Sequence, residues 1–197
     1  FWVNPLGMNF SQISVSDLLL VKEDGQIIQG NRPINPAAFA IHSSIHKARP
    51  DVNSAAHAHS IFGRTFSSLG KLLDPITQDA ALFFQEQAIY DSYGGVAFDI
   101  EEGLAIAEAL GEKRTAILQN HGLLTTGTSV DIAIWLFIAM DKCCQSQLLA
   151  DSAGSPIIIS DEIALQAKAQ AGTDMILWAS FQPLYDLIYA MESNFLK

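Results

Sequence analysis

Two histidines separated by a single alanine, His57 and His59, stand at the end of a run of small residues over 53–60. If this run is a β-strand, its side chains alternate between the two faces, so both imidazoles point to the same side. Two imidazoles on one face of a rigid strand supply half of a metal site. The rest of the chain must then supply the other half.

The third candidate ligand is His121, in the segment Gln119-Asn120-His121-Gly122. Its asparagine and glycine predict a turn between strands over 115–118 and 123–126. Such a turn can place a side chain at the edge of a sheet, beside the end of another strand. Three neutral imidazoles with an open fourth position are typical of a catalytic zinc site. The alternative is that His57 and His59 form hydrogen bonds within a polar cleft and bind no metal.

A second pair, His42 and His46, is spaced four residues apart on a helix predicted from Asn35-Pro36 to Ala48. Histidines at this helical spacing can also share a metal. Ser43 follows the first histidine, where a metalloprotease motif has a glutamate. We therefore expect His42 to pack against the sheet and His46 to lie near the surface.

Helical and strand patterns alternate along the chain, which predicts an α/β fold with at least one hairpin. Asp24-Gly25 predicts the hairpin turn, between strands over 18–22 and 26–28. The strongest helical pattern, over 130–151, is apolar on much of its surface and is predicted to be buried. Further helices are predicted over 61–69, 79–91, 99–110 and most of 161–197, with a short strand over 96–98.

The length of 197 residues suits a single domain over 1–197. The chain begins in the middle of a strand-like segment without methionine, so we expect an N-terminal segment to be missing before Phe1. The net charge is −10 and no lysine or arginine cluster occurs, which argues against binding to nucleic acid or to an anionic membrane. The longest apolar stretch, over 132–140, is too short to span a bilayer.

The cysteines Cys143 and Cys144 are neighbours in the sequence, where a mutual disulfide is strained. We interpret them as buried thiols in a reducing compartment, which predicts a cytoplasmic protein. Only 16% of the residues are charged, which suggests that part of the surface is buried in a homo-oligomer.

Two segments resemble the class II aldolase/adducin head-domain family. They are 41–53 with the following His57-Ala58-His59-Ser60, and 117–125 around Asn120-His121-Gly122. The resemblance runs from Phe1 to about Ala150. It is closest to the adducin-like branch, where Asn35-Pro36-Ala37-Ala38 replaces the Ser-Ser-Glu pattern of the enzymes. It implies a class II aldolase-like fold, a sheet flanked by helices in three αβα layers.

In the aldolase branch of this family, the corresponding histidines hold a divalent metal, usually zinc. The resemblance therefore implies that His57, His59 and His121 are metal ligands. The metal polarises a carbonyl and stabilises an enediolate while a carbon–carbon bond breaks or forms. The implied function is that of a metal-dependent lyase, an aldolase or a decarboxylase, acting on a small hydroxy or oxo carbonyl substrate. The family's enzymes are commonly tetramers.

The sequence departs from the aldolase pattern at the residue that moves protons. The aldolases carry a glutamate in the helix before the histidine strand, and counting back from His57 places Ala38 there. We predict that Glu86 is the catalytic acid/base instead, although a solvated helix carboxylate is the alternative. A decarboxylase needs less proton transfer than an aldolase. The second hypothesis, also based on Ala38, is a non-catalytic adducin-like metal-binding scaffold or protein-interaction module.

Overall fold

A computed structural model describes residues 1–95 and 99–197, in which the strands form two sheets. The smaller sheet has the antiparallel order β1 (Trp2–Val3), β2 (Leu19–Val21) and β3 (Ile27–Gln29). The larger sheet has the order β4-β7-β6-β5. Its strands are β4 (Ser54–Ala58), β5 (Gln87–Tyr90), β6 (Thr115–Leu118) and β7 (Gly122–Gly127). Among the described strands of this sheet, only β5 and β6 pair in parallel.

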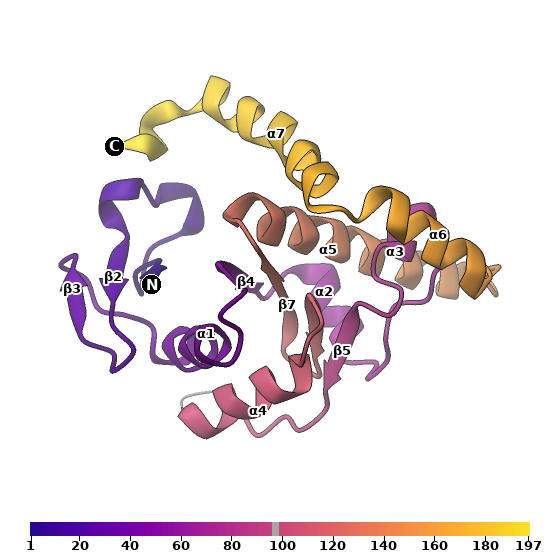
Figure 1. Ribbon diagram of the computed structural model, residues 1–197, viewed down its shortest axis with the longest axis horizontal. Coiled ribbons are helices and arrows are strands. Elements are labelled where there is room, and N and C mark those ends of the chain that lie inside the picture. The colour runs from indigo at the N-terminus through magenta and orange to yellow at the C-terminus, as the bar shows by residue number, and fades with distance from the viewer. Residues whose placement is uncertain (96–98) are drawn as a thin grey trace.

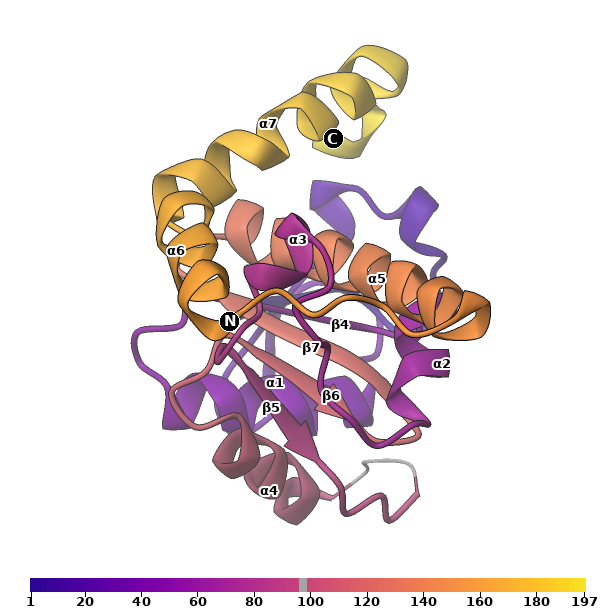
Figure 2. The ribbon, with the colours of Figure 1, turned by 90° about the vertical axis from the view of Figure 1, so that its right-hand side faces the viewer.

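Helices cover both faces of the larger sheet, which confirms the predicted αβα layers (Figures 1 and 2). The helices α1 (Pro36–Ala48) and α4 (Ile100–Leu110) form one layer. The long α5 (Val130–Ala153) and the short α2 (Ile61–Ser67) lie on the other face. The remaining helices are α3 (Gln78–Ala81), α6 (Asp161–Ala171) and α7 (Asp174–Met191), with 3₁₀ turns at Phe10–Gln12, Val15–Asp17 and Ser193–Leu196.

Strand alternation divides the core between the two helical layers. On β6, Ile117 packs with residues of α5, whereas its neighbours Ala116 and Leu118 pack with α1 and α4. On β7, Leu123 and Leu124 divide in the same way. All five side chains are fully buried. The strands β6 and β7, which flank the turn that carries His121, are therefore packed on both faces.

The predicted start of α1 and the predicted hairpin are confirmed. Asn35 Oδ1 accepts a hydrogen bond from Ala37 N at 3.0 Å, and Pro36 occupies the first helical turn. α1 packs very closely against α4, because a Cβ atom added at Gly103 would lie 2.1 Å from the carbonyl oxygen of Ala40. This contact fixes α1 relative to the sheet and therefore relative to the histidines.

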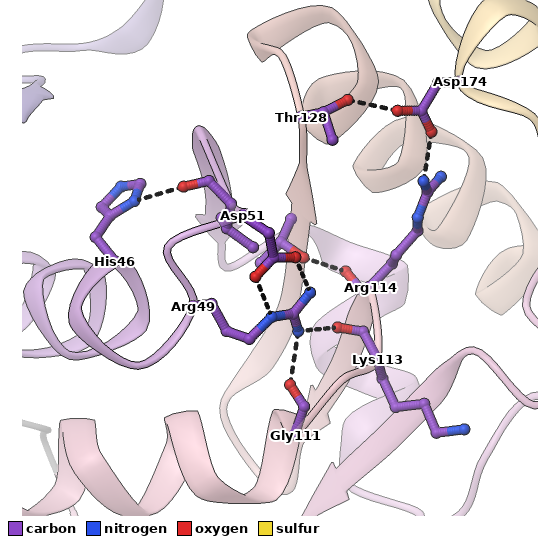
Figure 3. Close-up of polar contacts among 10 residues, drawn as sticks. His46, Arg49, Asp51, Gly111, Lys113, Arg114, Thr128 and Asp174 are labelled. Carbon is purple, nitrogen blue, oxygen red and sulfur yellow. Dashed lines mark hydrogen bonds and ion pairs between the residues drawn. The ribbon is translucent and has the colours of Figure 1, made fainter.

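Side-chain contacts tie the ends of several elements together (Figure 3). The guanidinium of Arg49, just after α1, pairs with Asp51 and donates to the carbonyl oxygens of Gly111 and Lys113 at 2.6 and 3.1 Å. In the same view, Asp174 at the start of α7 accepts hydrogen bonds from Arg114 and Thr128. The first set anchors α1 to the turn after α4, and the second anchors α7 to the larger sheet.

The prediction of one helix over 79–91 is wrong. α3 ends at Ala81, Gln85 turns the chain in a left-handed conformation with φ of 61°, and β5 follows in parallel pairing with β6. The apolar residues of this segment are spaced so that they fit a helix or a buried strand equally well, and pairing with β6 decides the outcome. The strand predicted over 96–98 lies outside the described residues.

The helix predicted over 130–151 is α5, and it is long and apolar enough to cross a membrane by length and composition alone. In the fold it packs against β4, β7, α2 and α7. Its two cysteines, Cys143 and Cys144, are buried as predicted. α7 leaves this core and extends towards the N-terminal segment, so that both chain ends lie on one side of the molecule (Figure 1).

Candidate metal centre

The fold brings the three predicted histidines together. One potential ligand atom from each of His57, His59 and His121 lies within 4.8 Å of the other two. His57 is on β4, His59 follows the last residue of that strand, and His121 occupies the turn between β6 and β7. Antiparallel pairing sets Ala58 opposite Leu123, which places this turn beside the end of β4. The predicted edge-of-sheet arrangement is therefore present.

The orientation of His57 is fixed by the backbone of β7. Its Nδ1 lies 2.8 Å from the carbonyl oxygen of Leu123 and donates a hydrogen to it. This bond selects the tautomer whose Nε2 carries the free lone pair, as is usual for metal-binding histidines. Burial, together with the nearby His121, lowers the pKa of His57 to about 3. Burial and His59 also lower the pKa of His121. Both rings are therefore neutral near pH 7 and able to bind a cation.

The turn that carries His121 depends on the left-handed backbone of Asn120 and on the missing side chain of Gly122. Asn120 has a φ of 58°, in the left-handed region that asparagine tolerates better than most residues. At Gly122, an added Cβ atom would lie 3.0 Å from the carbonyl oxygen of Ala58 and 3.7 Å from His57 Cε1. A side chain there would push the turn away from β4, so Gly122 permits the close approach of His121 to the other two histidines.

The histidines open into a cavity of about 770 Å³. Its walls come from the N-terminal segment, α1 and the end of β4. The lining residues are Asn4, Phe10, Asn35, Ala37, Ala38, Ile41, His42, His57, Ala58, His59, Ser60 and His121. No lysine or arginine lines it within the described part of the chain. Ser60 Oγ is buried without a hydrogen-bond partner beside the histidines.

The donor set fits a divalent cation of the zinc type. Three neutral imidazoles converge from a rigid strand and a constrained turn, and one of them has its tautomer fixed through a backbone carbonyl. Imidazole nitrogen is a preferred ligand of Zn²⁺, and a set of three histidines leaves a fourth position for a substrate. The cavity lies where that substrate would have to bind.

The other histidine pair separates into two roles. His46 is half-buried, with Nδ1 3.2 Å from the carbonyl oxygen of Val52 and its ring beside that of Phe1. His42 instead lines the cavity of the three histidines and an adjoining cavity of about 290 Å³ that includes Phe137. Burial lowers the pKa of His42 to about 4. One sequence feature indicates that His42 lies at the cavity, namely its spacing of four residues from Ala38 on α1.

Glu86 lies apart from the histidines. It precedes β5, whereas His121 follows the far end of the parallel neighbour β6, so the two residues lie beyond opposite ends of the paired strands. The Glu86 carboxylate is 3.1 Å from Lys168 Nζ and lines a separate cavity of about 270 Å³ with Arg114. Its catalytic role stays a prediction. Tyr93, which sequence analysis did not single out, has its ring centre 6.4 Å from that of His121.

Comparison with known proteins extends these observations. The sequence model described as "Class II Aldolase and Adducin N-terminal domain" matches residues 1–148. Decarboxylase NovR of Streptomyces niveus is 41% identical over 195 residues, which are 98% of this chain and 72% of that protein. A Streptomyces roseochromogenus subsp. oscitans protein, described as "4-hydroxy-3-prenylphenylpyruvate oxygenase/4-hydroxy-3-prenylbenzoate synthase", is also 41% identical, over 98% of this chain and 70% of its own length.

Among solved structures, the L-fuculose 1-phosphate aldolase from Glaciozyma antarctica PI12 superposes with a TM-score of 0.93 at 40% identity. The match covers all of this chain and 78% of that one. The likeness therefore includes α6 and α7, which lie beyond the residues matched by the family model.

Proposed function

Because this chain belongs to the family of class II aldolase and adducin N-terminal domains, we propose that it is a divalent-metal-dependent carbon–carbon lyase of the aldolase or decarboxylase type. Its substrate is a small hydroxy or oxo carbonyl compound, and its metal is zinc. The observation that carries the proposal is the convergence of His57, His59 and His121 at one wall of a cavity large enough for such a molecule.

A bound divalent metal supplies Lewis-acid stabilisation of the negative charge that develops on a carbonyl oxygen as a carbon–carbon bond breaks. The three histidines hold it, and the Leu123 carbonyl keeps His57 in the tautomer that can do so. Phe10 and Ile41 add apolar surface to the cavity lining, which leaves less water around a bound substrate. Reduced solvation strengthens electrostatic interactions inside the site.

We favour decarboxylation over aldol cleavage within this class. Ala38 supplies no acid or base to the cavity, and the carboxylate of Glu86 is paired with Lys168 in another one. Loss of CO₂ from a 3-oxo acid requires no base to begin, because the electron pair of the broken bond moves onto the carbonyl oxygen, and only one proton, which water can supply, has to return to carbon afterwards. The relative from Streptomyces niveus, which is described as a decarboxylase, supports the same choice.

The test combines metal analysis with a substrate panel of 3-oxo, 2-oxo and 3-hydroxy acids. We expect zinc bound in a one-to-one ratio, release of CO₂ from an oxo acid, and loss of turnover after chelation that zinc restores. The His121→Ala variant should show neither zinc binding nor turnover. A purified protein that binds no divalent metal, or whose turnover survives both chelation and His121→Ala, would overturn the proposal.

A second candidate function follows from Ala38, which removes the proton-transferring carboxylate of the aldolases. The chain would then be a metal-binding, adducin-like scaffold or interaction module without turnover. The two functions differ in the same experiment, since the scaffold binds zinc but converts no member of the panel.

We further propose a cytoplasmic homo-oligomer, a tetramer by its resemblance to the family's enzymes. Large apolar side chains along α7 support assembly, because Met175, Leu187 and Met191 are 75%, 55% and 73% exposed. Light scattering on the purified chain measures the mass directly, and a monomer at micromolar concentration would contradict this part of the proposal.

A further inference from the structure

One face of α1 forms a wall of the metal-site cavity. Ala38 and His42 are four residues apart on this helix, so their side chains lie on the same face, one turn apart. Both line the cavity that contains His57, His59 and His121. Ala38 has a short apolar side chain, which leaves open the space between this face and the metal site. His42, one turn further along the helix, carries a polar ring on the same face.

The ring of His42 has no hydrogen bond to any described residue, in contrast to the rings of His46 and His57. His46 bonds to the backbone at Val52, and His57 bonds to the backbone at Leu123. Among the described residues, the side-chain polar atoms that are buried without a hydrogen-bond partner are Ser60 Oγ and Glu102 Oε1. The ring nitrogens of His42 have no partner and are not among these atoms, so they are not shielded from solvent. The His42 ring is therefore held among packed residues while its polar atoms remain accessible to the cavity.

The other polar groups of the cavity leave few alternatives for binding a substrate oxygen. Away from the three converging histidines, the polar side chains that line it are those of Asn4, Asn35, His42 and Ser60. Asn35 Oδ1 is already used to cap α1, and Ser60 Oγ is shielded from solvent. His42 therefore presents the accessible ring nitrogens on the helical wall that faces the metal site. A neutral imidazole offers one donor and one acceptor, which suits a carbonyl or carboxylate oxygen.

We propose that His42 is a substrate-contacting residue that donates a hydrogen bond to an oxygen of the bound oxo acid, on the wall where Ala38 provides no polar group. This inference rests on the proposed function, because it requires a metal-bound substrate in the same cavity. The helix holds the donor in place before the substrate arrives, so little side-chain entropy is lost when the hydrogen bond forms. The ligand class is an oxo acid whose oxygens are shared between the metal and the helical wall.

The experiment separates metal binding from ligand binding. Zinc affinity is measured by competition with a chromophoric chelator on the wild type and on the His42→Leu, His42→Gln and His46→Gln variants. Each zinc-loaded protein is then titrated calorimetrically with oxalate, a small dicarboxylate that chelates divalent metals and leaves two oxygens free. His42→Gln retains a donor and an acceptor, and His46→Gln makes the same change one helical turn outside the cavity.

We expect all four proteins to bind zinc with similar affinity. Oxalate binding should weaken about tenfold or more in His42→Leu, the loss typical of a missing hydrogen bond to a charged oxygen. His42→Gln should recover most of that affinity, and His46→Gln should match the wild type. Unchanged oxalate affinity in His42→Leu would overturn the inference alone, as would loss of zinc binding in this variant. Absence of zinc binding by the wild type would instead overturn the proposed function itself.

Discussion

The imidazole rings of His57 and His121 meet edge to face, with their centres 4.7 Å apart and 79° between their planes. One ring is carried by β4 and the other by the turn that leads into β7, and the pairing of these two strands sets their separation. The hydrogen bond from His57 Nδ1 to the Leu123 carbonyl adds a second link between the same strands. Backbone pairing thus sets the geometry of the candidate metal centre. Each substitution there is therefore expected to have its own effect on zinc affinity and on stability.

Replacement of any one of the three histidines by alanine should lower zinc affinity by at least about 100-fold, because a two-histidine remnant cannot complete the site. The variants should differ in stability. His59 is exposed and its loss should leave the free energy of unfolding of the metal-free protein almost unchanged. His57→Ala removes a half-buried, hydrogen-bonded ring and should cost about 1–3 kcal/mol. Zinc competition and urea unfolding measure the two effects, and equal stability losses in both variants would contradict the assignment.

Gly122→Ala should weaken zinc binding without touching a ligand. The new Cβ atom would meet the Ala58 carbonyl oxygen at 3.0 Å, so the turn must move and take His121 with it. We expect a loss of about tenfold or more in zinc affinity and about 1–2 kcal/mol in stability. The matched control is Gly154→Ala, since a Cβ atom there meets nothing within 4 Å. Zinc affinity in Gly122→Ala equal to that of the control would show that the turn tolerates the shift.

The three histidines were predictable because their signals are local. Alternation along β4 and the residue that follows it places His57 and His59 on one face, and the asparagine and glycine around His121 specify a turn. The position of Glu86 was not predictable in this way. The apolar spacing after Asp79 fits a helix, and only the partner strand β6 shows that β5 begins directly after Glu86.

The cavity itself was beyond sequence reasoning for a related reason. Phe10 and Asn4 come from the N-terminal segment, whereas Ala38 and His42 come from α1, and only the packed fold brings them to one wall of the site. The four-residue spacing of Ala38 and His42 is that of two residues on one face of a helix. It could not show that this face turns towards the three histidines, because that depends on the close contact of α1 with α4 at Gly103.

The Glu86→Gln variant tests whether this carboxylate takes part in the reaction. Its pairing with Lys168 and its position beyond the opposite end of the strands predict unchanged zinc affinity and turnover within about twofold of the wild type. The stability change should be below about 1 kcal/mol, since the pair is partly exposed to water. Lys168→Met is the matched variant for the other half of the pair. Turnover slowed by about two orders of magnitude or more in Glu86→Gln alone would establish Glu86 as the acid/base predicted from the sequence.

The half-buried His42 should make the metal-free protein less stable in mild acid. Burial lowers the pKa of His42 to about 4 in the folded state, from 6.5 in the unfolded chain. Between pH 6.5 and about pH 4, His42 binds a proton in the unfolded chain but stays neutral in the folded protein. The stability that depends on neutral His42 is therefore fully present above pH 6.5 and is lost as the pH falls towards 4. The contribution is on the order of 2 kcal/mol, because the accessible side of the ring moderates the effect of burial.

The comparison that isolates this effect is between the metal-free wild type and His42→Leu, unfolded by urea at pH 7 and at pH 4.5. Burial also lowers the pKa values of His46, His57 and His121, so both proteins should lose stability on acidification. The wild type should lose more, because only it contains His42, and the difference between the two losses is the contribution of that residue. Identical losses would mean that the His42 ring is solvated in the folded state. His42 would then titrate near its ordinary pKa, and its ring would not be held among packed residues at the cavity wall.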